Sequence, residues 1–345
     1  MIIISCFILE VIVNSHSNCH KINCFPRNLV LLYFVMNKLA IVIPYYKISF
    51  FEETLKSVFA QTDKRFTLYI GNDASPDNPK SLIIKYFPAG NYNYYDYSEN
   101  IGSKNLAMQW KRILDNVTEE WFQILGDDDM ISENFVETFY ENLDTVINDG
   151  SSVIRSPHIH INKNGTIIKD FTFQDRNSNA ATFFQNITQR RISASLSENI
   201  FKYAEYLKVG FRNIPLAWGT DYLAIYEFSK KRPIFFLQNS LVSVRVTDLS
   251  ISGRNDNEKE KRSAKIKFYE IILKDHLQDL DIKFILDLVT GYLKEMRASK
   301  KLVSANIVTK FIFRPRTLIK IITNNFVVFV KNITAYKNSK KFGQL

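Results

Sequence analysis

Three consecutive aspartates, Asp127, Asp128 and Asp129, follow the apolar segment Trp121–Leu125 and the turn residue Gly126. Adjacent carboxylates repel one another unless a cation neutralises them. Carboxylate oxygens suit Mg²⁺ or Mn²⁺, and Mg²⁺ held by one or two carboxylates completes its shell with substrate phosphates. The triplet therefore predicts a divalent-metal site that handles a phosphorylated substrate. The alternative is an acidic turn that caps the following helix.

Other polar residues stand where further apolar segments end. Asp73 follows the segment Phe66–Gly71, and Asn100 and Gly102 follow the tyrosine-rich stretch Tyr92–Tyr97. Ligands of parallel α/β sheets bind outside the carboxyl ends of the strands. We therefore expect these residues and the aspartate triplet to face one ligand.

The segments that must position these residues alternate between short apolar runs and helical patterns. Strands are predicted at 39–43, 66–71, 92–97 and 121–125, and helices at 50–61, 81–87 and 106–114. This alternation predicts an α/β sheet with parallel strands. Beyond residue 149 the pattern is less regular. It predicts strands at 153–161, 165–173 and 235–246, and helices at 198–208, 221–230 and from 259 onward.

Over roughly residues 41–143, and more weakly to about Ser252, the chain resembles the family-2 glycosyltransferases of GT-A fold. The matching pieces are the strand into Pro44 and Tyr45, residues 55–62 (LKSVFAQT), the turn 72–77, residues 100–102 and residues 125–129. The resemblance implies a Rossmann-like nucleotide-diphospho-sugar transferase domain over residues 36–255. A mainly helical, basic C-terminal region would follow over residues 256–345.

The resemblance also implies roles for single residues in donor binding. Asp73 would contact the nucleotide base, with Pro44 and Tyr45 lining the same pocket. Asn100 and Gly102 would border the nucleotide on the next strand end.

The DXD motif of the family, which holds the metal and the diphosphate of the nucleotide sugar, falls on Asp127, Asp128 and Asp129. Asp128 would be the principal ligand of Mg²⁺ or Mn²⁺, and Asp127 would also contact the nucleotide sugar. Arg245, in a segment that resembles an Arg-x-His-x-x-Ser pattern, would lie near the diphosphate.

The resemblance places the catalytic base on Asp221, in the motif Trp218–Leu223. It would accept the proton of an acceptor hydroxyl in an inverting single displacement. An unperturbed aspartate has a pKa of about 3.9, which predicts an ionised base at pH 7. The alternative is a helix N-terminal residue that interacts with the helix dipole.

The chain departs from the family pattern at several positions. The usual turn with two aspartates and a glycine reads Asn72, Asp73, Ala74, so an amide replaces one base-contacting carboxylate. An arginine common in the helix after Gly102 is missing, and Lys104 or Arg112 could substitute for it. The sequence also has Thr247 where many relatives have histidine, and Thr220 where an acid usually precedes the base.

Composition describes a folded protein with an uneven charge. The chain of 345 residues is 46% hydrophobic and 23% charged, which excludes disordered and collagen-like proteins. Of the net charge of +10, residues 296–345 hold 11 basic and no acidic residues. We expect this segment to contact the surface of an anionic membrane, or alternatively to pack its apolar side on the transferase domain. We do not expect a nucleic-acid partner, because no nucleic-acid-binding motif accompanies the charge.

All three cysteines, Cys6, Cys19 and Cys24, lie in the first 35 residues. The cysteine-free remainder fits a reducing compartment, so we expect a cytoplasmic protein at the inner face of the cytoplasmic membrane. His16 and His20 with two of these cysteines match no closed zinc pattern.

Residues 1–35 are interpreted as a mis-assigned extension, with Met36 as the true start, or alternatively as a weak membrane-proximal leader. His158 and His160 share one face of a predicted strand. They are either a metal- or acceptor-binding pair or ordinary partly buried residues.

Together these observations predict an inverting, metal-dependent glycosyltransferase. It would move a sugar from a nucleotide-sugar donor to a glycan acceptor, expected to be lipid-linked, in bacterial cell-surface polysaccharide synthesis. One alternative is a sugar nucleotidyltransferase, whose usual Gly-rich opening loop is not found at Pro44–Lys47. The other is a non-catalytic nucleotide-sugar-binding or membrane-scaffold protein.

Overall fold

The computed structural model describes residues 37–172, 179–229, 232–247 and 257–342, and the side chains up to residue 332. The predicted extension 1–35, with its cysteines and with His16 and His20, lies outside the described residues. So does the predicted domain boundary at residues 255–256.

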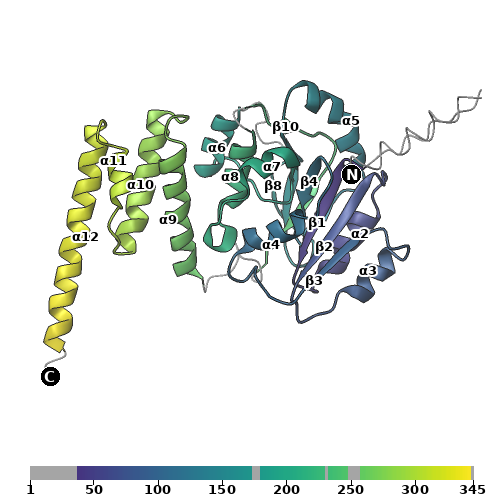
Figure 1. Ribbon diagram of the computed structural model, residues 1–345, viewed down its shortest axis with the longest axis horizontal. Coiled ribbons are helices and arrows are strands. Elements are labelled where there is room, and N and C mark those ends of the chain that lie inside the picture. Colours follow the sequence, from purple (N-terminus) through teal and green to yellow (C-terminus); the bar gives the residue numbers. More distant parts are fainter. Residues whose placement is uncertain (1–36, 173–178, 230–231, 248–256, 343–345) are drawn as a thin grey trace, which may run out of the picture. The chain divides into compact units, whose positions relative to one another are not determined.

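A seven-stranded mixed sheet carries the N-terminal part, in the order β10-β6-β9-β4-β1-β2-β3 (Figure 1). Its strands are β1 (Leu39–Tyr45), β2 (Phe66–Asp73), β3 (Asn93–Tyr97), β4 (Trp121–Ile124), β6 (Val153–Arg155), β9 (Asn199–Lys202) and β10 (Phe235–Phe236). A second sheet has the order β5-β11-β7-β8. Its strands are β5 (Met130–Ile131), β7 (His158–Ile161), β8 (Ile167–Asp170) and β11 (Val242–Arg245).

The helices cover both faces of the large sheet and continue to the C-terminus (Figure 1). They are α2 (Phe51–Phe59), α3 (Lys80–Tyr86), α4 (Leu106–Leu114), α5 (Phe135–Asn148), α6 (Ala180–Thr188), α7 (Tyr203–Val209), the 3₁₀ helix η1 (Pro215–Ala217), α8 (Thr220–Ser229), α9 (Glu258–Asp275), α10 (Ile282–Ala298), α11 (Ala305–Thr309) and α12 (Pro315–Phe342).

The continuous apolar run of β1 reflects burial on both faces. Leu39–Ile43 are fully buried, and β1 pairs in parallel with β2 and β4. Ala40 and Val42 join a core cluster with α4, α6 and α8, whereas Ile41 and Ile43 pack in a second cluster with α2 and α5. The predicted parallel α/β arrangement is therefore confirmed for β1 to β4.

The predicted helix at 198–208 is wrong over its first turn. Residues 199–202 form β9, which runs antiparallel between β4 and β6, and the helix α7 begins only at Tyr203. Ile200 packs in one core cluster and Phe201 in the other. Adjacent residues that face opposite sides are typical of a strand, but two apolar residues are too few to distinguish this pattern from a helix.

Two long predicted strands are each divided between the two sheets. Residues 153–161 become β6 and β7, separated at Ser156 and Pro157, since proline lacks the N–H that a central strand needs. Residues 235–246 become β10 and β11. Between them, Asn239 adopts a left-handed φ of 64°, which interrupts an extended chain.

The C-terminal region is mainly helical, as predicted. Buried side chains of α9 and α10, including Phe268 and Tyr292, belong to the same core cluster as those of α8. The buried face of α12 carries Thr317, Ile321, Asn324 and Val328 at helical spacing. Within the described part of the chain, no helix combines the length and the apolar character needed to cross a membrane.

Candidate active site

The ends of three parallel strands bring the predicted site residues to one edge of the sheet. Tyr45 at the end of β1 lies opposite Asn72 of β2, and Asp73 lies opposite Tyr97 of β3. The neighbouring strand β4 leads through Gly126 into the aspartate triplet. The segments predicted to face one ligand therefore follow strands that are neighbours in the sheet order β4-β1-β2-β3.

Asp127 connects the triplet to the end of β1. Its Oδ2 accepts hydrogen bonds from the backbone N–H groups of Tyr46 and Lys47, both at 2.7 Å. Burial and the charge of Asp128 raise the pKa of Asp127 to about 6, against the opposing effect of the two amides. The bonds fix the loop between β1 and α2 beside the triplet.

Asp129 connects the aspartate triplet to Arg245 of β11 and to Ser197, which precedes β9. It is 6% exposed, and its carboxylate accepts hydrogen bonds from the Arg245 backbone N–H at 2.8 Å and from the Ser197 hydroxyl. Burial and the charge of Asp128 raise the pKa of Asp129 well above its ordinary value. Each of its carboxylate oxygens accepts a hydrogen bond from the protein, and its role as a metal ligand stays a prediction.

Asp128 differs from both neighbours. Among the residues that the structure describes, no other residue forms a hydrogen bond to its carboxylate, while its carbonyl accepts one from Arg245 Nε at 3.1 Å. Burial raises the pKa of Asp128, and the charges of Lys47 and Arg245 oppose this shift. The middle aspartate is thus the member of the triplet whose carboxylate is available to a ligand.

These residues fit a cation that arrives with a phosphorylated substrate. Across the described ranges, no three His, Cys, Asp or Glu side chains gather into a protein-only metal cage. Mg²⁺ in nucleotide sites typically takes one or two carboxylates and substrate phosphates. The available carboxylate of Asp128, with Asp127 next to it, meets that requirement.

Arg245 is enclosed behind the triplet. It is 3% exposed, and its Nη1 donates to the carbonyls of Asn162 and Lys163 at 3.1 and 3.2 Å. Its Nη2 pairs with Glu53, and its guanidinium lies 4.2 Å from the ring centroid of Phe50. The side chain of Arg245 therefore connects β11 to α2 and to the β7–β8 hairpin. Its proposed contact with the donor diphosphate stays a prediction.

Asp73 is also bonded within the protein. Its carboxylate accepts hydrogen bonds from the backbone N–H groups of Ile101 and Gly102 at 2.9 and 2.8 Å, and it pairs with Arg112. A Cβ on Gly102 would lie 2.5 Å from Asp73 Oδ2, so this approach requires glycine. Arg112, one of two suggested substitutes for the missing arginine, is therefore paired with Asp73 and stacks on Tyr97.

The departure at Asn72 has a local explanation. Its Nδ2 donates to Asp96 Oδ1 at 2.8 Å, and its Oδ1 accepts from the backbone N–H of Ser75 at 2.9 Å. A carboxylate at this position would face Asp96 without a proton to donate. The next departure, Ala74, adopts a φ of 52°, a conformation that glycine reaches without strain.

Tyr45 and Tyr46 are placed on opposite sides of the strand end. Tyr45 is buried, donates to the carbonyl of Asp77 at 3.0 Å, and has a pKa that burial raises to about 12. Tyr46 is 40% exposed, and its carbonyl accepts from the Ser75 hydroxyl at 2.7 Å. Tyr46 and Ser75 were not among the predicted site residues, whereas Tyr45 was. The period of two along β1 places Tyr45 with the buried Ile41 and Ile43.

The remaining two predicted donor residues are Pro44 and Asn100. Pro44 is a partly exposed residue near the end of β1. Asn100 closes a turn, because its Oδ1 accepts from the backbone N–H of Ser103 at 2.9 Å.

Asp221 stands in the first turn of α8, directly after a strained connection. Leu216 and Ala217 have φ angles of 58° and 49°, and Gly219 has a φ of 77°. A Cβ on Gly219 would lie 2.8 Å from the ring of Phe268 in α9, so helix α9 packs directly on this turn. Asp221 is thereby placed at the start of α8 by a turn that packs against α9.

The expectation that Asp221 has an ordinary pKa is wrong. Burial, followed by the charge of Glu198, raises the pKa of Asp221 to about 7. The backbone N–H groups of residues 221 and 222 and the charge of Arg155 oppose the shift. A pKa raised toward neutrality suits a group that exchanges protons near pH 7.

Comparison with known proteins decides the family. Residues 40–214 match glycosyl transferase family 2. The chain belongs to this family. The protein is therefore a glycosyltransferase of the EC 2.4 class, and its α/β GT-A fold agrees with the sequence analysis. A comparison with curated proteins gives no match.

Solved structures agree with the fold of this glycosyltransferase. The crystal structure of TarS residues 1–349 from S. aureus is similar with a TM-score of 0.56 and 14% identity, covering 86% of this chain and 92% of that chain. The same part of TarS in complex with UDP-GlcNAc gives a TM-score of 0.54 at 14% identity and the same coverage.

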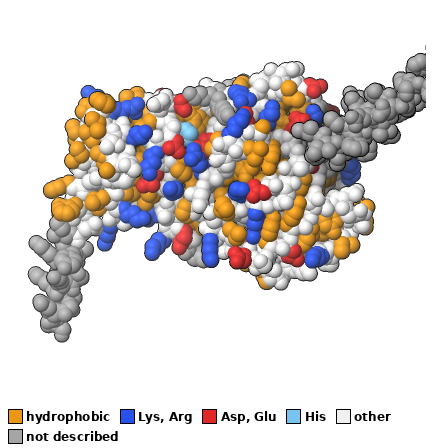
Figure 2. All heavy atoms as spheres, in the orientation of Figure 1, with side chains coloured by type: hydrophobic (Ala, Val, Ile, Leu, Met, Phe, Trp, Pro, Cys, Tyr) orange, Lys and Arg blue, Asp and Glu red, His pale blue; other side chains and the backbone are white. Residues whose placement is uncertain are grey.

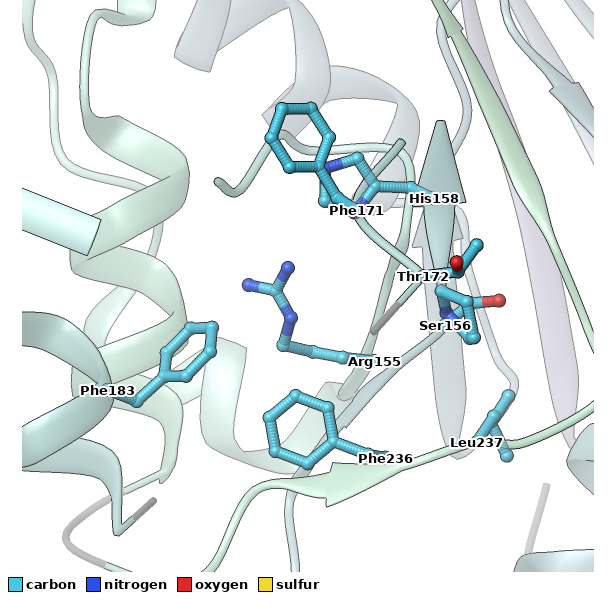
Figure 3. Close-up of a pocket in the computed structure, with 9 residues that line it drawn as sticks. Arg155, Ser156, His158, Phe171, Thr172, Phe183, Phe236 and Leu237 are labelled. Atoms are coloured by element: carbon cyan, nitrogen blue, oxygen red, sulfur yellow. The ribbon is translucent and has the colours of Figure 1, made fainter. Parts of the chain in front are cut away.

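Two buried charged residues of this glycosyltransferase lie close to Asp221, and the sequence did not predict them. Arg155 and Glu198 form an ion pair at 2.8 Å with both side chains at most 2% exposed. Figure 3 shows the guanidinium of Arg155 directed toward His158 and Phe171, in a small cavity beside Phe183. Arg155 and Glu198 lie 43 residues apart, so no local spacing signals the pair.

The two histidines of this glycosyltransferase have different surroundings. His158 is 1% exposed, and burial lowers its pKa to about 4, so the ring is neutral at pH 7. His160 lines a separate, larger cavity together with Trp218, Gly219 and Tyr222. His158 therefore lines the small cavity beside Arg155, and His160 lines the larger one.

Proposed function

We propose that this glycosyltransferase moves a sugar from a nucleotide-sugar donor to a hydroxyl group of a glycan acceptor, with inversion at the anomeric carbon. The observation that supports this most is the division of roles among the three aspartates. Asp127 and Asp129 are held by the protein, whereas the carboxylate of Asp128 is available beside them. Such a site suits a metal ion that comes with a diphosphate.

The proposed reaction is a single displacement. The acceptor oxygen forms a bond to the anomeric carbon as the bond from that carbon to the diphosphate oxygen breaks. Asp221 accepts the proton of the attacking hydroxyl, and the electron pair of the broken bond leaves with the nucleoside diphosphate. The raised pKa of Asp221, about 7, suits a base that takes a proton during the reaction.

Asp128, supported by Asp127, would hold Mg²⁺ or Mn²⁺. A bound cation would offset the negative charge that develops on the departing diphosphate. Asp73, Asn72 and the loop after β1 would border the nucleotide at the neighbouring strand ends. Because Asp73 is bonded to backbone amides, we infer that it shapes this pocket by fixing residues 101 and 102.

Uridine diphosphate is the first nucleotide to test, because TarS residues 1–349 have been crystallised with UDP-GlcNAc and with UDP. The full chain would be melted with UDP, GDP, dTDP or CMP, each with and without Mn²⁺. A ligand at 100 times its dissociation constant should stabilise the fold by about 2.7 kcal/mol. We expect UDP to raise the melting temperature only with metal. If no nucleotide changes it under either condition, the proposed function is wrong.

The exposed side of α11 and α12 supports a peripheral membrane contact. Apolar side chains gather there among lysines and arginines (Figure 2). Ile319, Ile322, Phe326 and Phe329 recur at helical spacing and are 54–66% exposed, opposite the buried face of α12. We propose that this stripe, with Arg316 and Lys320 beside it, contacts an anionic membrane surface at the cytoplasmic side, where the chain would meet a lipid-linked acceptor.

Sedimentation with vesicles tests the membrane contact. We expect the full chain to bind vesicles that contain 30% phosphatidylglycerol far more strongly than pure phosphatidylcholine, because each basic residue contributes about 1 kcal/mol at an anionic surface. The double variant Ile319→Ser/Phe326→Ser should lose this binding. The matched control is Ile167→Ser/Ile168→Ser, which removes two exposed isoleucines of β8. Equal loss in both double variants would contradict the proposed surface.

A further inference from the structure

A cavity of about 530 Å³ lies beside the proposed catalytic base. Its lining residues include Gly219 and Tyr222, which stand on either side of residues 220–221 in the sequence. The other walls come from the β7–β8 hairpin, the segment after α6, and α9. Its volume falls in the range of about 300–1,000 Å³ that is usual for ligand pockets.

The cavity has a strongly positive lining. Lys169, Arg190, Arg191 and Lys265 contribute four cationic side chains, and no aspartate or glutamate is among the lining residues. Within the described ranges, the side chains of Lys169, Arg190 and Lys265 form no hydrogen bond or ion pair with another residue. Like charges gathered around one cavity repel one another, so an anion that enters it would be stabilised.

This lining contrasts with the other arginines around the catalytic edge. Arg112, Arg155 and Arg245 each form an ion pair with a carboxylate of the chain itself. Donors of those three arginines are therefore already used within the chain. Among the residues that the structure describes, Lys169, Arg190 and Lys265 have no carboxylate partner, which leaves their donors available for a ligand, whereas Arg191 donates to Asn186 Oδ1 at 3.1 Å.

Aromatic side chains form the rest of the cavity. Trp218 and Tyr222 come from the turn that bears Asp221, and Phe268 and Tyr269 come from α9. Their faces provide apolar surfaces for the C–H side of a sugar ring. The charge of Arg190 partly offsets the rise that burial causes in the pKa of Tyr222 and Tyr269, which places this guanidinium near both rings.

We propose that this cavity binds an anionic group, a phosphate or a carboxylate, carried by the acceptor glycan. The inference rests on the proposed function, because it uses Asp221 as the base that faces the acceptor. Arg190 and Lys265 bind the anion, and the aromatic faces hold the sugar that carries it. The adjoining hydroxyl is thereby presented to Asp221, and an uncharged glycan is bound less well.

Trp218 supplies a local optical signal for the test. It is partly exposed in the cavity, whereas Trp110 and Trp121 are buried elsewhere. The full chain, saturated with UDP and Mn²⁺, would be titrated with glucose 6-phosphate, glucuronate and glucose while tryptophan fluorescence is followed. We expect at least one of the two anionic sugars to bind tenfold or more tightly than glucose. Stronger binding of the phosphate or of the carboxylate identifies which anion the cavity prefers.

The variant Arg190→Gln/Lys265→Gln should abolish this preference, because each lost ionic contact is expected to weaken binding by about tenfold. The matched control, Lys283→Gln/Lys294→Gln, removes the same charge from exposed positions on α10 and should keep the preference. If glucose binds as tightly as both anions, or if the first variant weakens UDP binding instead, the inference is wrong. If the wild-type chain binds UDP with Mn²⁺ but does not prefer the anionic sugars, this inference fails while the proposed function stands.

Discussion

Asp221→Asn is expected to lower kcat for sugar transfer by about 10²–10⁴-fold and to leave the affinity for UDP and Mn²⁺ unchanged. The amide is isosteric and cannot accept a proton from the acceptor hydroxyl. It also removes a negative charge close to Glu198, so the fold should not be destabilised. The measurement is single-turnover transfer at saturating donor, with nucleotide affinity measured on the same preparation.

The pH dependence gives an independent readout of the same assignment. The pKa of Asp221 is raised to about 7, and the ionised form is the base. The wild-type rate should therefore fall about tenfold for each pH unit below 7 and level off above pH 7. The residual rate of Asp221→Asn should not show this decrease at low pH. Asp144→Asn, an exposed aspartate of α5, is the control and should behave like wild type. Near-normal transfer by Asp221→Asn would show that another group is the base.

Asp128→Asn should abolish the stabilisation by nucleotide and metal, a loss of about 2.7 kcal/mol at 100 times the wild-type dissociation constant. The unliganded protein should melt at the same temperature as wild type or slightly higher. The reason is that the charge of Asp128 raises the pKa of both Asp127 and Asp129, so its removal relieves repulsion.

Asp129→Asn is the informative comparison for that experiment. Its carboxylate accepts hydrogen bonds from Arg245 and Ser197, and an unsatisfied buried partner costs about 1–3 kcal/mol. This variant should therefore melt at a lower temperature without ligand. If Asp128→Asn destabilised the unliganded protein as Asp129→Asn does, or retained its nucleotide shift, Asp128 would not be the metal-binding residue.

The sequence predicted the strands that are buried on both faces, because such strands need continuous apolar runs. It also predicted the position of the aspartate triplet at the end of β4. The family resemblance singled out Asp128 as the principal ligand, but the sequence could not show which hydrogen bonds hold Asp127 and Asp129, since their partners come from distant segments. Arg245, for example, pairs with Glu53 across 192 residues. The pair of Arg155 and Glu198 was missed for the same reason.

Short elements were predicted least well. β9 contains four residues, too few for a period of two to be distinguished from the start of a helix. The raised pKa of Asp221 could not be predicted from the sequence either. It depends on burial and on the charge of Glu198, which lies near Asp221 only in the folded chain.

The contact between Phe268 and Gly219 has a consequence for how such enzymes can diversify. Because α9 rests directly on the turn that bears Asp221, the helical region is not an interchangeable module. A recombination event that replaced the helices would also remove Phe268 from the turn that bears Asp221, the proposed base. Positions 219 and 268 are therefore sterically coupled, and a side chain added at position 219 is expected to require a smaller residue at position 268.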